Sequence, residues 1–131
     1  MPSTTIEIRT SYSPEQETAI IDAVQAALVE AFKIPVDDRC VRLICHAPHR
    51  FICPSDRSSP ERYTVVTVTA FQGRSLEAKR RLYQAIVGNL AQCGIARDHV
   101  KILLHEVPLE NWGLRGGVPA SELNLGFEVN V

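Results

Sequence analysis

The sequence lacks any apolar run that approaches the ~20 residues needed to cross a membrane, and no charged-then-apolar leader opens it. It also lacks a charge excess, because its formal net charge is only −1. Neither nucleic acid nor an anionic membrane is therefore predicted as a bulk electrostatic partner, and lysine and arginine must act locally. We expect a soluble, cytoplasmic protein.

Paired cysteine spacing is absent as well. The four cysteines contain no CxxC motif, and the histidine pair His46 and His49 matches no closed zinc site. We expect no metal and reduced structural thiols at all four positions: Cys40, Cys45, Cys53 and Cys93.

What the chain does contain is an internal repeat. Its 131 residues, 45% of them hydrophobic, can bury one core but hardly two, so we expect a single domain over 1–131. Two pseudo-repeats of strand, helix and strand occupy about 1–48 and 63–108. A loop over 47–62 connects them, and a further segment follows over 109–131.

Each repeat carries clear element boundaries. In the first, strand-like alternation over 3–9 precedes Ser13-Pro14-Glu15-Gln16, which reads as a capping box, and Pro35 ends the helix near Lys33. In the second, a strand over 63–71 leads to a turn at Gly73, a helix cap at Ser75 and a stop at Gly94. The closing strands, 41–46 and 100–105, match in character residue by residue.

These repeats predict the fold class. A strand–helix–strand crossover is right-handed and makes its two strands parallel. Two such units give an α+β fold, in which one four-stranded mixed sheet carries both helices on one face. We expect the other face to be bare and apolar and to be covered by another subunit. The loop over 47–62, with a short extended piece at 50–52, is long enough to be functional or oligomer-forming.

Pro2 is the most informative single residue. If Met1 is removed, Pro2 becomes a secondary amine held in place by the first strand. An α-amino group has a pKa of about 8, which burial or a neighbouring cation lowers, so an unprotonated base would be available near pH 7. The alternative is an unimportant residue in a frayed terminus. Whether Met1 is removed is left open.

Three other residues are candidates on their own chemistry. Arg42 is a charge inside an apolar strand, which requires either a cavity or an acidic partner. Trp112, in a segment with three glycines, suits the apolar wall of a pocket for a planar ligand, although core packing or a subunit contact would serve equally. Arg115 could border the same site. The glycines do not open a helix, so we predict no phosphate cradle.

Together these features resemble the tautomerase superfamily. The resemblance rests on Pro2 before a strand, on the two repeats, on the turn Gly73-Arg74-Ser75 and on the segment Asn111 to Gly117. The Gly-Arg-Ser turn resembles one in 4-oxalocrotonate tautomerase, here carried by the second repeat. The long-chain branch, with both units in one polypeptide, is the closer match.

The resemblance implies a homotrimer with the proline in a pocket at or near a subunit boundary, small carboxylate substrates such as 2-oxo acids and their enols, and no cofactor. It further implies Pro2 as general base and acid, Arg74 as carboxylate anchor and Arg42 as a second arginine at the site. Asp38, or its neighbour Asp37, resembles an aspartate of malonate semialdehyde decarboxylases, although acids are routine in such a loop.

One departure bears on the reaction. The decarboxylases place two arginines two residues apart, whereas this chain has Gln72-Gly73-Arg74 and keeps only the second. We therefore predict a tautomerase-type isomerase that moves a proton between carbon and oxygen of a 2-oxo acid or related unsaturated carboxylate. The alternatives are a decarboxylase or hydratase assisted by Asp38, and a trimeric ligand-binding module without activity.

Overall fold

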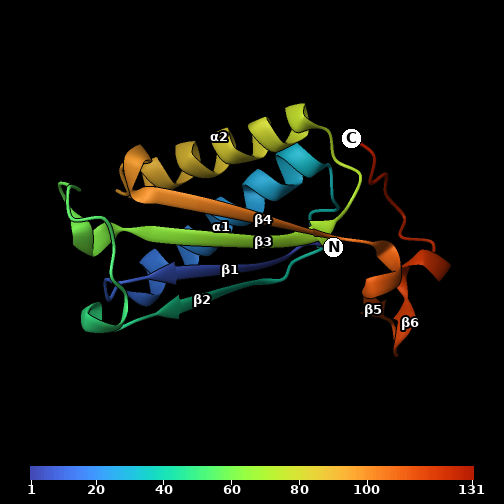
Figure 1. Cartoon of the computed structure of the whole chain (residues 1–131), viewed down its shortest axis with the longest axis horizontal. Coiled ribbons are helices and arrows are strands. Elements are labelled where there is room, and N and C mark those ends of the chain that lie inside the picture. The colour runs from blue at the N-terminus through green and yellow to red at the C-terminus, as the bar shows by residue number, and fades with distance from the viewer.

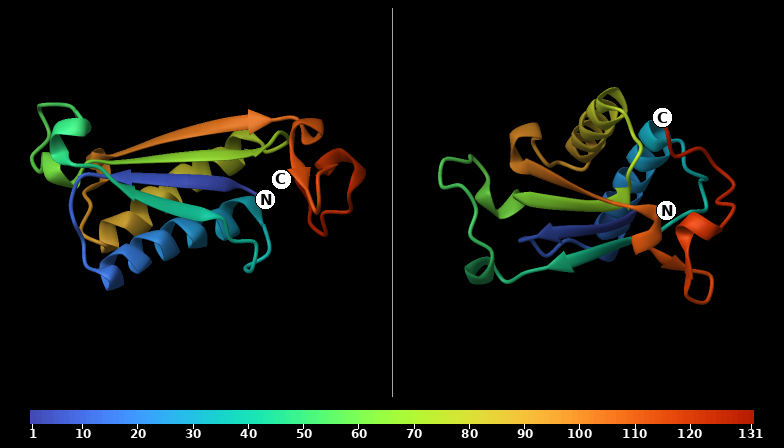
Figure 2. Two further views of the ribbon diagram at one scale, coloured as in Figure 1. Left: turned by 90° about the horizontal axis from the view of Figure 1, so that it is seen from below. Right: turned by 45° about the vertical axis from the view of Figure 1, so that its right-hand side comes forward.

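A computed structural model describes all residues, 1–131. Its main body is a four-stranded sheet in the order β2-β1-β3-β4, with two long helices packed on one face (Figures 1 and 2). The elements are β1 Ser3–Ile8, α1 Pro14–Phe32, β2 Val41–Cys45, β3 Thr64–Phe71, α2 Leu76–Gln92 and β4 Val100–Val107. The predicted α+β fold class is confirmed.

The strand directions follow the repeat. β1 is parallel to β2, β3 is parallel to β4, and the two units meet where β1 runs antiparallel to β3. Each helix crosses over between the parallel strands of its own unit. The amino end of β1 and the carboxyl ends of β3 and β4 consequently lie at the same end of the sheet (Figure 1).

The predicted helix boundaries are confirmed. Ser13 accepts a hydrogen bond from the Gln16 backbone, and the Gln16 side chain accepts one from the Ser13 backbone, which completes the capping box. Lys33 ends α1 in the left-handed conformation, with φ of 56°. Ser75 caps α2 through the Ala78 backbone N–H. Both helices therefore begin and end where local chemistry places them.

The core lies between the helices and one face of the sheet. Alternate strand residues such as Ile6, Ile8, Val66 and Val68 are fully or almost fully buried there. They pack against the inner stripes of α1 and α2, which include Leu28, Phe32, Leu82, Ile86 and Leu90.

The opposite face of the sheet differs from the expectation. Most of its side chains are polar. Threonine is suited to this face because it has the branched shape that strands favour and a hydroxyl that can contact water. Only Ile44 and Leu103 are large apolar side chains that stand substantially exposed there, each at 45%. The strand residues at the alternate positions are Ser3, Thr5, Glu7, Arg42, Ile44, Val65, Thr67, Thr69, Phe71, Lys101, Leu103, His105 and Val107.

The connecting loop also differs in detail. Of the extended piece predicted at 50–52, Arg50 instead belongs to a single turn of 3-10 helix at Pro48–Arg50, whereas Phe51 has extended backbone angles, with φ of −138° and ψ of 92°. A second single turn of 3-10 helix lies at Pro60–Arg62. Buried His99 fixes the loop, because its Nε2 accepts a 3.0 Å hydrogen bond from the Ser59 backbone.

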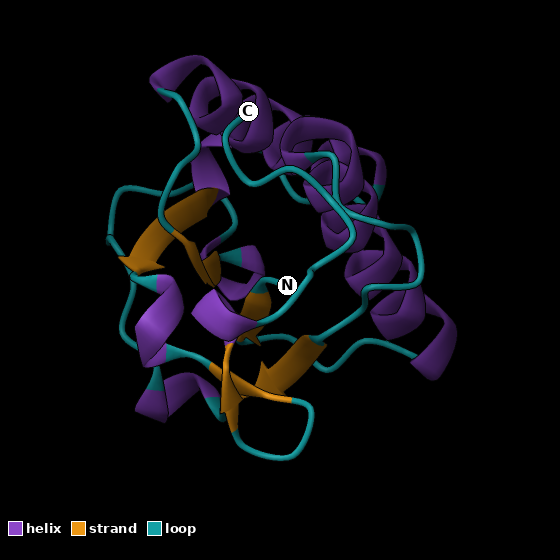
Figure 3. Ribbon diagram, turned by 90° about the vertical axis from the view of Figure 1, so that its right-hand side faces the viewer, coloured by secondary structure: helices purple, strands orange, loops and turns teal.

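The C-terminal segment folds past the amino terminus. It contains a short hairpin, β5 Gly113–Leu114 with β6 Val118–Pro119, and the chain then loops back toward α2. Viewed end-on in Figure 3, this segment and the neighbouring loops surround the amino end of the chain. Neither helix has the length and apolar character required to cross a bilayer.

Candidate active site

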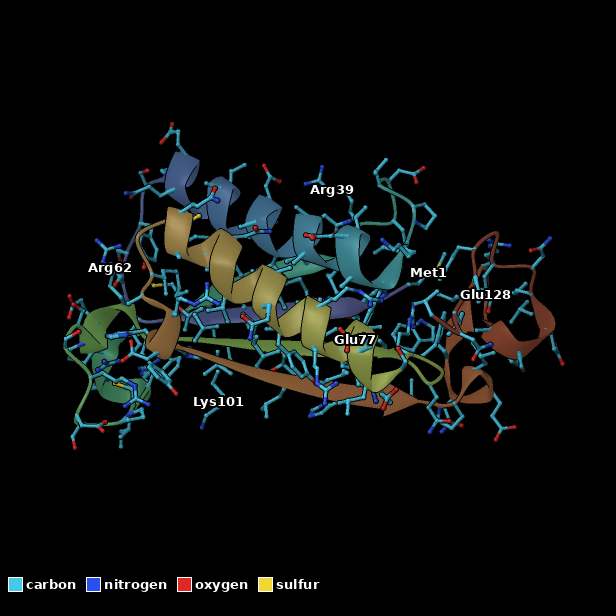
Figure 4. The ribbon with its side chains drawn as sticks, turned by 90° about the horizontal axis from the view of Figure 1, so that it is seen from above. Met1, Arg39, Arg62, Glu77, Lys101 and Glu128 are labelled. Carbon is cyan, nitrogen blue, oxygen red and sulfur yellow. The ribbon has the colours of Figure 1, made fainter.

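Pro2 lies at the open end of β1 and is buried. The Thr4 backbone N–H donates a 3.0 Å hydrogen bond to the Cys40 carbonyl, which ties this end of β1 to the segment entering β2. Figure 4 shows Met1 at the junction between the helix–sheet body and the C-terminal segment that carries Glu128. The amino terminus is thus held in place and is not frayed.

The terminal amine belongs to Met1 in this chain, so the Pro2 nitrogen is an amide. The Met1 nitrogen lies 3.4 Å from Asp38 Oδ2, a distance that indicates an ion pair more than a well-formed hydrogen bond. Burial lowers the pKa of this amine, Asp38 acts to raise it, and the positive charge of Arg74 lowers it further. The Met1 amine stands one residue before the Pro2 amine that a processed chain would have.

Asp38 is the acid that faces the terminus. Its side chain is 15% exposed, whereas Asp37 is an exposed residue. Gln25, on the buried stripe of α1, donates a 3.1 Å hydrogen bond from Nε2 to the Asp38 carbonyl and so fixes its backbone. Sequence reasoning missed Gln25, although a polar residue within an apolar helical stripe could have indicated it.

Arg74 is buried to 5% exposure immediately after the Gly73 turn. Its guanidinium carbon lies 4.6 Å from the ring centroid of Phe32, and its Nη1 donates a 3.2 Å hydrogen bond to the Phe71 carbonyl. Its Nε and Nη2 are buried without any partner. Burial lowers the pKa of Arg74, while the charges of Glu106 and Asp38 oppose that shift. Two unpartnered donor nitrogens on a buried cation are a candidate anchor for an anionic ligand.

Two hollows adjoin the terminus, and they share two residues. The first, of about 320 Å³, is lined by Met1, Pro2, Ser3, Asp38, Cys40, Trp112 and Leu114. The second, of about 310 Å³, is lined by Met1, Pro35, Asp37, Asp38, Arg115, Leu125 and Phe127. Arg74 lines neither hollow in this Met1-bearing chain. Met1 and Asp38 therefore border both hollows.

A larger hollow of about 470 Å³ lies between α1 and the loop that follows it, and its lining includes Gln25 and Val36. Its charged walls include Asp22 and Arg39, which pair with each other at 2.9 Å. It contains neither the terminus nor a buried unpaired donor, so we do not assign the active site to it.

Two further predicted residues, Trp112 and Arg115, each line one of the hollows. Trp112 packs edge-on against Phe71, with 4.8 Å between ring centroids, and lines the first hollow. Arg115 lines the second and donates a 3.1 Å hydrogen bond to the Asn124 carbonyl.

Arg42 lines neither hollow and has no acidic partner. It is exposed on the bare face of the sheet, where it donates to Cys40 Sγ and to Thr5 Oγ1, both at 3.1 Å. Within one chain, therefore, the structure brings Pro2, Asp38, Trp112 and Arg115 to the hollows, whereas Arg42 and Arg74 line neither of them.

The sequence profile of tautomerase enzymes matches residues 38–115 of this chain. A probable tautomerase of Ralstonia nicotianae, RSp0893, is 37% identical over 62 residues, which cover 44% of this chain and 81% of that protein. The crystal structure of FG41 malonate semialdehyde decarboxylase inhibited by 3-bromopropiolate superimposes with a TM-score of 0.77 at 32% identity. That match covers 86% of this chain and 88% of the decarboxylase.

A fused 4-OT asymmetric trimer shares the fold, with a TM-score of 0.80 at 19% identity over 91% of this chain and 96% of its own. The chain belongs to the tautomerase family, as its resemblance predicted. This membership supports enzymatic activity of the tautomerase-superfamily kind.

Proposed function

We propose that the chain, once Met1 is removed, catalyses keto–enol proton transfer on a 2-oxo acid or a related unsaturated carboxylate. The observation that carries the proposal is the environment of the terminal amine, seen at Met1: burial lowers the pKa of this amine, Asp38 opposes that shift, and Arg74, which has two unpartnered donors, lowers it further. An amine that is neutral near pH 7 can accept a proton, and a buried guanidinium can hold a carboxylate.

The reaction conserves atoms and electrons. The Pro2 nitrogen accepts the enol hydroxyl proton, the O–H electron pair becomes part of a C=O bond, and the C=C pair forms a new C–H bond by taking a proton from the ammonium. Arg74 would hold the carboxylate and stabilise the negative charge of the developing enolate. Trp112 would form the apolar wall beside the plane of the substrate, and no cofactor is needed.

We also propose that the chain forms a homotrimer. The fused 4-OT of similar fold is a trimer, and the bare sheet face is the surface through which three copies of this chain would associate. Arg42 lies on that face, so a homotrimer would bring it close to a neighbouring subunit. We infer that Arg42 serves the site of a neighbour rather than that of its own chain.

The test compares two preparations whose amino termini are established by intact mass, one starting at Pro2 and one retaining Met1. The Pro2-terminal protein should convert phenylenolpyruvate to phenylpyruvate, followed by ultraviolet absorbance, and the Met1-retaining protein should not. Equal turnover by both would show that the proline amine is not the catalytic base.

Arg74 has its own test. Arg74→Ala in the Pro2-terminal protein should lower kcat/KM by about 10- to 100-fold, since charged hydrogen bonds contribute about 1.5–3 kcal/mol each. The exposed Arg81, replaced by alanine, is the matched control and should leave kcat/KM unchanged. Equal losses in both variants would remove the argument for a carboxylate anchor.

Decarboxylation or hydration of malonate semialdehyde is the second candidate. It is favoured by the contact of Asp38 with the terminal amine and by the 32% identity to a malonate semialdehyde decarboxylase. A carboxylate beside the amine favours its protonated form, which suits an acid more than a base. Release of acetaldehyde and carbon dioxide from malonate semialdehyde, without ketonisation of phenylenolpyruvate, would select this candidate.

A further inference from the structure

We propose that the Met1 side chain occupies the place of the substrate's tail, so that the processed site takes a monocarboxylate with an apolar alkyl or aryl tail. The proposal rests on the proposed function, because it concerns the same site. It narrows the substrate class and disfavours dicarboxylates and three-carbon acids, which have no such tail.

The surroundings of Met1 are the first argument. Its side chain packs with a small apolar cluster built on Phe71, Ala120 and Val129, which is separate from the main core. The other members at its rim are Leu109, Trp112, Leu114, Leu125 and Phe127, and all of these except Leu109 also line the two hollows. We call the apolar surface around the Met1 side chain the seat. A residue that is removed by processing does not require such a surface, whereas a ligand that takes its place would be bound by it.

Charge is the second argument. Arg74 is the buried cation whose charge reaches the terminal amine, and it has two free donors for one carboxylate. Beyond the amine, the second hollow presents Asp37 and Asp38 against the single cation Arg115, which already donates to the Asn124 carbonyl. A second carboxylate on the ligand would meet more negative charge than positive charge there.

Shape is the third argument. Met1 lines both hollows, whose volumes are about 320 and 310 Å³. The vacated seat adjoins both hollows, which leaves room for an extended tail and far more room than a three-carbon acid needs.

The test measures binding, not turnover, with three unreactive ligands: acetate, hexanoate and adipate, the last being hexanoate with a second carboxylate. Calorimetry is performed on the Pro2-terminal protein, on the Met1-retaining protein and on Met1→Gly. The glycine blocks the Pro2 nitrogen as an amide just as Met1 does, but it has no side chain to fill the seat.

Hexanoate should bind the Pro2-terminal and Met1→Gly proteins at least about tenfold more tightly than acetate, since each buried methylene adds affinity. It should bind them at least about tenfold more tightly than adipate as well. The Met1-retaining protein should show no preference for hexanoate over acetate. Met1→Gly should bind hexanoate but should not turn over substrate. This result would distinguish binding in the seat from proton transfer by the Pro2 amine.

Leu125→Gln in the Pro2-terminal protein places a polar group in the seat and should weaken hexanoate by about tenfold while leaving acetate unchanged. Leu123→Gln is the matched control, because Leu123 lines neither hollow.

Tighter binding of adipate than of hexanoate, equal hexanoate affinity in the Met1-retaining and Met1→Gly proteins, or no hexanoate binding at all would overturn the proposal. Absence of turnover in the Pro2-terminal protein, with the binding pattern intact, would count against the proposed function alone.

Discussion

Asp38 and Arg74 act on the terminal amine in opposite directions. The anion favours the protonated amine and the cation favours the neutral one, while burial works with the cation. If Pro2 acts as a base, kcat/KM falls as pH drops below the pKa of its amine, because the neutral form is lost. The position of this acidic limb therefore reports on the pair of charges around the amine.

Asp38→Asn removes the anion and leaves the other two influences, so the pKa of the amine should fall. The acidic limb of the pH profile of kcat/KM should accordingly move to lower pH, as measured on the Pro2-terminal protein. Asp37→Asn is the control, because Asp37 is exposed and its side chain does not pair with the amine; its limb should stay in place. A shift to higher pH in Asp38→Asn would contradict the assigned electrostatics.

The sequence alone could predict part of this site. Pro2, Arg74 and the Asp37–Asp38 pair are recognisable because each lies within a local motif, and the structure brings Asp38, not Asp37, to the terminus. Gln25 and Leu125 are distant from these motifs along the chain and reach the site only through tertiary folding. No local pattern could distinguish the choice between the two aspartates, since it depends on how the backbone leaves α1.

At the scale of an element, the turn between β3 and α2 determines where Arg74 lies. Gly73 has φ of 127°, a conformation that residues with a Cβ rarely adopt. A Cβ built there would also approach Asn130 Oδ1 to 2.6 Å, although that exposed side chain can move. The backbone angle is thus the main constraint, and glycine at this position is a requirement of the turn.

Gly73→Ala should lower the free energy of unfolding by about 1–3 kcal/mol, the usual cost of such a backbone conformation in a residue other than glycine. Gly88→Ala is a control with the opposite sign: Gly88 lies inside α2, and its added Cβ meets only Arg97 Nη1 at 3.7 Å. Alanine there should raise stability by roughly 0.5–1 kcal/mol. Both values come from urea denaturation at one protein concentration; destabilisation by Gly88→Ala exceeding that by Gly73→Ala would refute the account of the turn.

The ends of the helices could be predicted from the sequence, whereas the polarity of the bare face of the sheet could not. The reason is physical. Ser13, Lys33 and Ser75 lie at helix ends set by capping chemistry, which acts over three or four residues. The face of a strand depends instead on which neighbour covers it. Thr67 and Thr69 fit a strand on either face, so alternation alone could not tell a bare polar face from an apolar one.

At the scale of the whole molecule, the polar bare face changes how an assembly must form. A mostly apolar face would associate by burial alone, whereas this one combines hydroxyls and charges with Ile44 and Leu103. Specific pairing of polar groups would then accompany a small apolar contact. Such a face stays compatible with water before assembly, and a single misplaced charge at its apolar contacts would disfavour association.

Leu103→Glu tests that assembly. The wild-type protein should sediment at three times the 14.5 kDa of the chain, and the variant should sediment as a monomer, because the new carboxylate would lose its water inside the interface. Val36→Glu is the matched control: Val36 is more exposed, at 74%, but it follows α1 on the helical side of the molecule, so the mass should not change.

A monomeric wild-type protein at micromolar concentration, or an undissociated Leu103→Glu variant, would show that the bare face is not the interface. If the interface also completes the site through Arg42, the monomeric Leu103→Glu variant should lose turnover as well as assembly. Val36→Glu should keep both its trimeric mass and its turnover.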